Sequence, residues 1–388
     1  MNLGINGWRI HGQRTGVGRY LLNVVKNWTP EMVAGRFDQI NFYTPKPINQ
    51  DEILLPENIR ERVLRSDLPM IAWENSRMAS SADDDVIFCP SYTRPFIARG
   101  KTVVVTHDAV SQIYPELFPM SVRLFYNRLY GWSARHATLV ITDSEAARQD
   151  IARCWGVPLS HIRVVYLAPA EMFRPLPPYD ERISEARERL TGSSEPFFLF
   201  VGKLSGRRNI PLLLEAFAEL KRRTSLPHRL LLVGPNIHGM DLPRMIDELG
   251  IKETARHCQY VSDDDLNSIY NAAEAFISPS TYETVSLPVM EAQATGTPLI
   301  CIDTAGMRDI TGGAAFFIPQ LEVGGVIEAL SRLASDVSLR RELSEKGLAN
   351  AHRFSWQRCS LETLAVIEEA AHLPSPIRSL GASEACPR

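Results

Sequence analysis

Two acidic residues, Glu283 and Glu291, lie just before and inside a segment typical of a helix start. Ser286 can cap such a helix, Pro288 suits its first turn, and Gly296 ends it. Free N–H groups and the helix dipole at such a start attract phosphate. A carboxylate nearby must then face a neutral hydroxylated group, as a ribose or sugar supplies. The alternative is that Glu283 is an ordinary acid of a loop and that Glu291 is an ordinary surface residue of the helix.

Three cations, Lys203, Arg207 and Arg208, follow an apolar run and precede a helix that Asn209 can cap. Arginine offers a bidentate fork and lysine a point charge, and both stabilise the charge that grows on a leaving diphosphate. The loop therefore indicates a diphosphate site. The alternative is a set of solvated cations on a turn.

His107 follows a β-branched run and is expected at the carboxyl end of a strand, beside Asp108. A lone histidine is more often structural, but this position favours a functional role.

Gly16, Val17 and Gly18 open a helical pattern. Leu21 stands where a dinucleotide fingerprint requires its third glycine, which argues against a nicotinamide site. The alternative is an ordinary turn between a strand and a helix.

Two Asp-x-Asp sequences do not indicate a metal site. We interpret Asp263–Asp265 as cap and first-turn acids of a helix, and Asp83–Asp85 as a polar lead into a strand. The six cysteines are scattered, without a Cys-x-x-Cys pair or a Cys/His cluster. This argues against a zinc site or a disulfide framework and suits the reducing cytosol. We expect no metal and no other cofactor.

The composition describes a globular chain of two domains. It has 388 residues, 45% hydrophobic and 22% charged, without the roughly 20-residue apolar run of a membrane helix. The N-terminus lacks a secretory signal, so we expect a cytoplasmic protein. Residues 1–170 carry 19 Lys and Arg against 16 Asp and Glu, although the whole chain has a net charge of −3. The overall acidity argues against nucleic acid as a partner.

A basic and aromatic stretch spans residues 123–135. It can lie on a membrane interface, which predicts peripheral contact with the inner membrane surface. The alternative is a helix edge with solvated arginines.

Short β-branched runs alternate with helical patterns, which predicts an α/β fold with parallel sheets. A helix is predicted over 18–28 and another over 210–222, each with one apolar face. The predicted strands are 3–6, 40–44, 86–88, 102–106, 138–142 and 163–166 in the first half, and 197–201, 229–233, 275–278, 298–302 and 315–318 in the second.

A proline-rich segment predicts the domain boundary, because residues 168–179 contain four prolines. We expect a first domain over 1–170, a linker over 171–180 and a second domain over 181–356. A helix near 357–371 is expected to return to the first domain, and 372–388 to form a disordered tail.

The glutamate pair, followed by Ala-x-x-x-Gly-Thr-Pro, resembles the donor-site signature of family 4 glycosyltransferases. The resemblance implies that this chain is a retaining enzyme of the GT-B fold, with two Rossmann-like doubly wound domains facing a cleft. Five further segments resemble motifs of that family in the family's order: Arg14–Tyr20, Thr106–Pro119, Ile141–Ala147, Val201–Asn209 and Phe354–Trp356.

The resemblance also implies roles for individual residues. Glu283 and His107 would act at the transferred sugar, and Glu291 would bind the ribose. Lys203 and Arg208 would hold the diphosphate, which leaves Arg207 as a surface charge. The backbone of Gly16, Val17 and Gly18 would close over the donor phosphates or the acceptor. The remaining implied substrate-binding residues are Tyr260, Val261, Thr284, Val285, Ser286 and Leu287.

The chain departs from the family at Thr284 and Ser286, where the family usually has glycine. The donor sugar of this chain therefore cannot be inferred from the family. Mannose from GDP-mannose is our first expectation, ahead of UDP-glucose and dTDP-rhamnose. The expected acceptor is a glycan or lipid-linked saccharide of a cell-surface polysaccharide. The alternatives are a sugar-nucleotide epimerase of the same fold and an inactive protein that binds nucleotide sugars.

Overall fold

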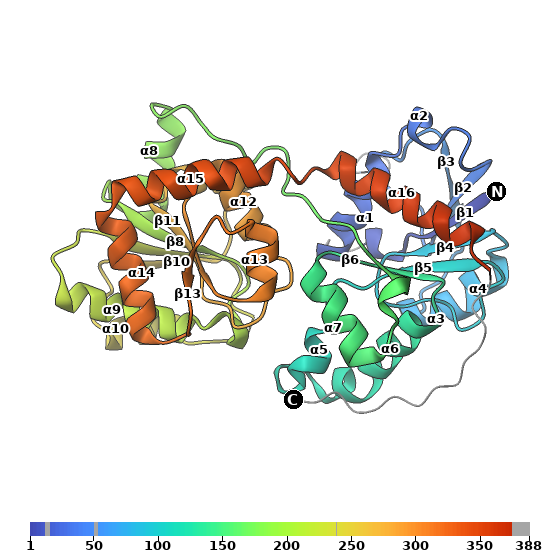
Figure 1. Ribbon diagram of the computed structural model, residues 1–388, viewed down its shortest axis with the longest axis horizontal. Helices are drawn as coiled ribbons and strands as arrows, with labels where there is room; N and C mark the ends of the chain where they lie inside the picture. The colour runs from blue at the N-terminus through green and yellow to red at the C-terminus, as the bar shows by residue number, and fades with distance from the viewer. Residues whose placement is uncertain (12–15, 50–52, 238, 375–388) are drawn as a thin grey trace. The chain divides into compact units, whose positions relative to one another are not determined.

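The structure is a computed structural model that describes residues 1–388 except 12–15, 50–52, 238 and 375–388. The chain forms two compact units, each with its own parallel sheet (Figure 1). One unit comprises Met1–Leu167 and the described residues from Ser355 onward, and the other comprises Ala168–Phe354. Most of the expected tail, and part of the glycine-rich motif near residue 14, lie outside the described residues.

The first unit contains a seven-stranded parallel sheet in the order β3-β2-β1-β4-β5-β6-β7. Its strands are β1 (Asn2–Asn6), β2 (Gln39–Thr44), β3 (Ile59–Val63), β4 (Val86–Cys89), β5 (Lys101–Val105), β6 (Leu139–Thr142) and β7 (Ile162–Val164). Their helices are α1 (Gly16–Lys26), α2 (Pro30–Val33), α3 (Met70–Trp73), α4 (Ala79–Ser81), α5 (Val110–Ile113), α6 (Asn127–His136), α7 (Glu145–Trp155) and α16 (Trp356–His372).

The second unit contains a six-stranded parallel sheet in the order β10-β9-β8-β11-β12-β13. Its strands are β8 (Phe197–Val201), β9 (Arg229–Val233), β10 (Ala255–Cys258), β11 (Ala275–Ser278), β12 (Leu299–Ile302) and β13 (Phe316–Ile318). Its helices are α8 (Glu181–Thr191), α9 (Ile210–Arg223), α10 (Leu242–Glu248), α11 (Asp263–Ala272), α12 (Leu287–Thr295), α13 (Ala305–Thr311), α14 (Val323–Ser335) and α15 (Val337–Ala351).

Both sheets have the strand order of a doubly wound fold, in which the order reverses beside the first strand. The reversal lies between β1 and β4 in one unit and between β8 and β11 in the other. Ligands of such folds bind at the carboxyl ends of these strands. Each unit therefore has one preferred binding edge.

Apolar side chains on both faces of each sheet form the cores. In the second unit, Phe198 and Phe200 pack with α9, whereas Phe197 and Leu199 pack on the opposite face. Full burial on both faces is typical of parallel strands. The predicted apolar face of α9 is confirmed, since Leu213, Phe217 and Leu220 are buried.

The C-terminal helix α16 packs in the first unit against α1, β4, β5 and β6 (Figure 1). The Trp28 indole donates to the Ser360 carbonyl, and Arg163 pairs with Glu369. The chain therefore returns to its first unit, as expected. No helix among the described residues has the length and hydropathy needed to cross a bilayer.

Three local expectations were wrong. Asn209 precedes α9, but it is left-handed and its amide donates to the carbonyls of Arg207 and Pro279 instead of capping the helix. Asp84 is buried and accepts hydrogen bonds from Asn41 and Tyr43, so it is a core carboxylate and not a polar lead. The α11 cap is Ser262, and Asp263–Asp265 form only its first turn.

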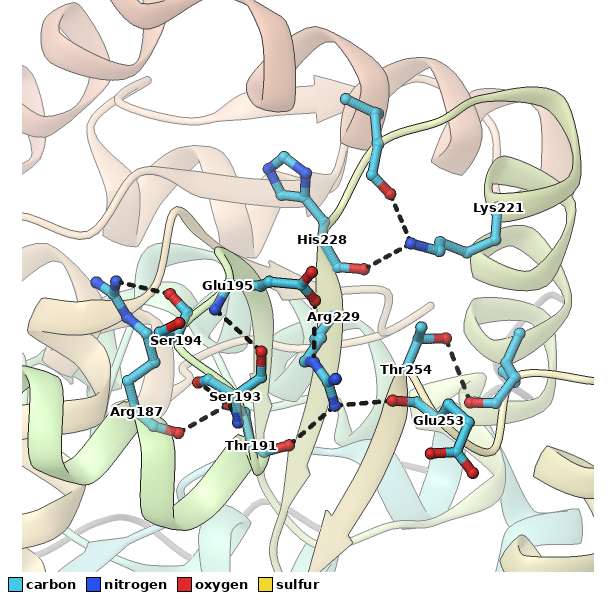
Figure 2. A network of polar contacts seen from close by, with 12 residues as sticks. Arg187, Thr191, Ser193, Ser194, Glu195, Lys221, His228, Arg229, Glu253 and Thr254 are labelled. Atoms are coloured by element: carbon cyan, nitrogen blue, oxygen red, sulfur yellow. Dashed lines mark hydrogen bonds and ion pairs between the residues drawn. The ribbon is translucent and has the colours of Figure 1, made fainter.

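A dense polar network lies at the opposite, amino end of β9 (Figure 2). Arg229 begins the strand, donates to the Glu253 carbonyl at 2.7 Å and pairs with Glu195. The Lys221 ammonium binds the carbonyl of His228. These contacts join chain segments to each other, far from the binding edge, so we assign the network to folding.

Candidate functional site

The loops that follow β8 and β11 form the candidate site of the second unit. The β8 loop carries Lys203 and a 3₁₀ turn, Gly206–Arg208, while the β11 loop leads through Glu283 into α12. The two strands are neighbours at the point where the strand order reverses. The sheet therefore brings the cationic loop and the acidic loop together.

Two arginines bind one carboxylate oxygen at this edge. Glu283 Oε1 lies 2.7 Å from Arg208 Nη1 and 2.9 Å from Arg207 Nη1. The Glu283 side chain is only 5% exposed, and that of Arg208 is 11% exposed. Arg207 was expected to be a surface charge, and this was wrong, because it also donates to the Tyr282 carbonyl at 2.7 Å.

Burial sets the electrostatics of this cluster. Desolvation lowers the pKa of Arg208, the charge of Glu283 opposes this effect, and Arg207 reinforces it. Arg208 also lies 3.3 Å from the Ser280 hydroxyl. The cluster thus holds two cations and one anion, which leaves an excess of positive charge that suits a diphosphate.

The start of α12 adjoins the cluster. Ser286 occupies the cap position, as expected, but its buried hydroxyl makes no capping bond and has no partner among the described residues. Pro288 lies in the first turn, and left-handed Gly296 ends the helix, as predicted. The predicted donor-site residues Thr284, Val285 and Leu287 flank Ser286, and Thr284 is buried.

Glu291 is held by a buried tyrosine. The Tyr270 hydroxyl donates to Glu291 Oε2 at 2.9 Å. Burial first, and then the charge of Glu291 and the hydrogen bond to it, raise the pKa of Tyr270 well above 10. Glu291 is therefore a positioned carboxylate and not a free surface side chain.

The remaining predicted residues of this unit are peripheral to the ion cluster. Lys203 is exposed and makes no hydrogen bond or ion pair within the described parts of the chain. Tyr260, in the loop between β10 and α11, is 82% exposed, whereas Val261 is buried. The Tyr260 ring is thus available to stack on a planar group.

In the first unit, the half-buried His107 pairs with the buried Asp143. Its Nδ1 lies 2.7 Å from Asp143 Oδ2, and these residues follow the neighbouring parallel strands β5 and β6. Burial lowers the pKa of His107, but the charge and hydrogen bond of Asp143 outweigh it, so the pKa is raised above 6.5. A backbone hydrogen bond to Pro90 adds to this rise in pKa, and His107 Nε2 is shielded from solvent.

The predicted glycine-rich residues lie in the first turn of α1. Gly16 is exposed, Val17 is half-buried, and Gly18 is buried. Tyr20, one turn later, has its ring centroid 5.2 Å from that of His107, and the two rings are nearly perpendicular. The structure therefore connects this helix start to the histidine.

The edge of the first unit contains polar residues that the sequence did not single out. Arg9 Nε donates to the Ser91 hydroxyl at 2.8 Å across the point where the strand order reverses. Asn6 donates to the fully buried Glu74, whose pKa desolvation raises to about 7. Glu74 lies in a π-helical turn, Glu74–Met78, and no sequence pattern connected it with β1.

Asp143 was also missed as a functional residue. A signal existed, because a polar residue directly after a buried strand is expected at the binding edge. Recognising its partner required the strand order, which places β6 beside β5. Among the described residues, no group of three or more His, Cys, Asp and Glu is arranged to hold a metal ion.

Comparison with known proteins gives matches over most of the chain. A family model described as "Glycosyltransferase Family 4" matches residues 15–168, and one described as "Glycosyl transferases group 1" matches residues 182–349. The O-antigen chain mannosyltransferase B of Escherichia coli is 28% identical over 367 residues, which cover 90% of this chain and 95% of that protein.

Two solved structures are similar at 18% sequence identity. HepE of Anabaena in complex with UDP-glucose has a TM-score of 0.72 and covers 94% of this chain and 98% of its own. Sucrose-phosphate synthase from Thermosynechococcus elongatus has a TM-score of 0.69, with 93% and 97% covered. These similarities confirm the expected two-domain GT-B fold.

Proposed function

Because the chain belongs to glycosyltransferase family 4, we propose that it transfers a hexose from a nucleotide diphosphate sugar to a glycan or lipid-linked saccharide during cell-surface polysaccharide synthesis. Mannose from GDP-mannose is the first donor to test, supported by the E. coli mannosyltransferase relative. UDP-glucose and dTDP-rhamnose come next.

The observation that carries this proposal is the Arg207–Glu283–Arg208 cluster at the binding edge of the second unit. Arg208 and Lys203 bind the diphosphate, and Glu283 takes sugar hydroxyls once the diphosphate occupies the cations. Glu291 accepts from the ribose, and the exposed Tyr260 ring meets the base, with the Val261 backbone beside it.

The reaction proceeds with retention at the anomeric carbon. The C–O bond to the diphosphate breaks, an acceptor hydroxyl attacks from the same face, and the leaving diphosphate takes its proton. Arg208 and Lys203 stabilise the charge on the diphosphate, in place of a metal ion. His107 orients the transferred sugar, and no protein nucleophile is required.

A thermal-shift panel of GDP-, UDP- and dTDP-sugars tests the donor, because a ligand of the folded state raises the midpoint by mass action. One nucleotide series is expected to raise it in the wild type but not in Arg208→Ala. The control is Arg223→Ala, which removes an exposed arginine paired with Glu219. No shift with any nucleotide sugar would contradict the proposal.

A second candidate is a binding protein that has lost turnover. Thr284 and Ser286 favour it, since both are buried where the family has glycine. Such a protein would bind a nucleotide sugar and transfer nothing. A sugar-nucleotide epimerase would instead convert UDP-N-acetylglucosamine without any acceptor, which the same preparations can test.

We also propose peripheral contact with an anionic membrane through an aromatic–basic face, defined here as Leu124, Phe125, Arg128, Trp132 and Phe96. Leu124, Arg128 and Trp132 recur every four residues along η4 (Val122–Tyr126) and α6, and so share one side. The ring centroids of Phe96 and Trp132 lie 4.9 Å apart. Leu124 and Phe125 are more than half exposed. Exposed apolar groups beside arginine suit an anionic lipid surface.

Co-flotation with vesicles tests this contact. The wild type is expected to float with phosphatidylglycerol-containing vesicles but not with pure phosphatidylcholine, and Leu124→Ser with Phe125→Ser is expected to abolish flotation. Val337→Ser is the matched control, because Val337 is 68% exposed in the other unit. Equal flotation of the control and the double variant would contradict membrane docking by this face.

A further inference from the structure

Arg207 joins the two loops of the candidate site through its backbone as well as its side chain. Its carbonyl oxygen accepts hydrogen bonds from the Thr281 N–H at 3.1 Å and from the Asn209 side-chain amide at 3.0 Å. Its Nη1 donates to the Tyr282 carbonyl at 2.7 Å and lies 2.9 Å from Glu283 Oε1. Arg207 is therefore fixed against the β11 loop by both its backbone and its side chain.

The Arg208 side chain is anchored less firmly. Within the described parts of the chain, its side-chain contacts are Glu283 Oε1 at 2.7 Å and the Ser280 hydroxyl at 3.3 Å, which is a long hydrogen bond. Burial lowers the pKa of Arg208, the charge of Glu283 raises it, and the neighbouring charge of Arg207 lowers it again. A poorly solvated cation gains most from an anionic ligand, so a diphosphate should stabilise Arg208 more than Arg207.

The carboxylate between the two arginines is held in place. A Cβ on Gly306 would lie 2.0 Å from the Glu283 carbonyl oxygen, so the Glu283 backbone packs directly against α13. The Glu283 side chain is only 5% exposed. A buried carboxylate is strongly unfavourable unless a cation or hydrogen bonds compensate its charge. A diphosphate can therefore take Arg208 at low cost only if another cation stays with Glu283.

We propose that the two arginines have different roles: Arg208 exchanges from Glu283 to the diphosphate, whereas Arg207 stays on Glu283 as a positioning residue. This inference rests on the proposed function, which places the diphosphate at Arg208. Arg207 does not touch the donor in this arrangement. It keeps the carboxylate paired and its oxygens in position, so the exchange leaves no buried charge without a partner.

Calorimetric titration of the full chain with GDP, UDP and dTDP tests this role. Arg207→Gln removes the charge but keeps a hydrogen-bond donor. Glu283 then competes with the diphosphate for Arg208, so the affinity for the nucleoside diphosphate should fall by roughly 10- to 100-fold. Arg207→Lys keeps the charge and should restore most of the affinity. Equal losses in Arg207→Gln and Arg207→Lys would contradict a role for the charge.

A double variant separates this role from direct binding of the diphosphate. In Glu283→Gln, no buried negative charge remains for Arg207 to neutralise. Adding Arg207→Gln to Glu283→Gln should therefore change the affinity by less than about 3-fold. A direct ligand of the diphosphate would instead weaken binding whether or not the Glu283 carboxylate is present.

Arg223→Gln is the matched control, because Glu219 also pairs with two arginines, Arg222 and Arg223, at the far end of α9. It should leave the affinity unchanged. Arg207→Met takes the place of Arg207→Gln if that variant does not fold. Equal losses with and without the Glu283 carboxylate, or wild-type affinity in Arg207→Gln, would overturn the inference while the proposed function stands. If none of the three nucleotides binds the wild type, the proposed function fails, and the inference fails with it.

Discussion

Arg208 Nη1 lies 2.7 Å from Glu283 Oε1, so the cation assigned to the diphosphate is paired with the carboxylate assigned to the sugar. Both side chains are almost fully buried. In the proposed function, a nucleotide sugar replaces Glu283 as the partner of Arg208, and this exchange releases the Glu283 oxygen for sugar hydroxyls. The pair thus keeps both charges stable and in position before the donor binds.

Arg208→Ala is expected to remove donor binding and to destabilise the protein together. Breaking a buried pair costs roughly 3–5 kcal/mol, and the cost here should fall toward the lower end because Arg207 still pairs with Glu283. Urea unfolding measures the loss. Adding Glu283→Ala should cost less than the sum of the single changes, since the buried carboxylate that has lost one of its two cations is then gone. Strict additivity would show that the pair is not coupled.

Lys203→Ala should separate binding from stability. Lys203 is exposed and makes no hydrogen bond or ion pair within the described residues, so its removal should change the free energy of unfolding by less than about 0.5 kcal/mol. Loss of one charged hydrogen bond to the diphosphate should still weaken donor binding by roughly 10-fold or more. Calorimetric titration with the nucleotide sugar checks this. If Lys203→Ala binds the nucleotide sugar with wild-type affinity, Lys203 does not belong to the donor site.

The Glu74 carboxyl should make stability depend on pH. Burial raises its pKa from 4.5 to about 7, so between these values the folded state keeps a proton that the unfolded state has lost. Stability attributable to Glu74 therefore falls as the pH rises from about 4.5 to 7, by about 3 kcal/mol in total, and is constant above.

Urea unfolding at pH 5 and pH 8 tests this dependence. Glu74→Gln should show a smaller loss of stability between the two values than the wild type, because glutamine does not titrate. Other groups contribute equally to both proteins and cancel in the comparison. The same pH dependence in the wild type and in Glu74→Gln would mean that the pKa of Glu74 is not raised toward 7.

The sequence predicted the central strands but missed one edge strand of each sheet, β3 and β10. Central strands such as β8, Phe197–Val201, are apolar runs because both faces are buried. The edge strands β3 and β10 contain charged or polar residues, Ile59–Val63 and Ala255–Cys258, which resemble loops in composition. Edge strands of this kind are determined by pairing with the neighbouring strand and not by a local hydrophobic pattern in the sequence.

The candidate site was predictable to the level of its loops. Residues directly after strands could be assigned to the binding edge, which placed Glu283, Arg208 and His107. Which side chains meet depends on strand order, so the Glu283–Arg207 pair and the His107–Asp143 pair were not foreseen. Glu74 gave no signal, because its contact with Asn6 joins residues that are 68 positions apart.

Gly306→Ala should displace the donor loop. A Cβ at Gly306 would lie 2.0 Å from the Glu283 carbonyl oxygen, and a backbone atom cannot move aside as a flexible side chain can. The start of α13 would push the Glu283 segment away from Arg208, so we expect lower stability and loss of the nucleotide-sugar thermal shift. Gly324→Ala in α14 is the control, since a Cβ there meets nothing within 4 Å and should stabilise the helix by about 0.5–1 kcal/mol. Wild-type stability and donor binding in Gly306→Ala would show that this close approach does not fix the loop.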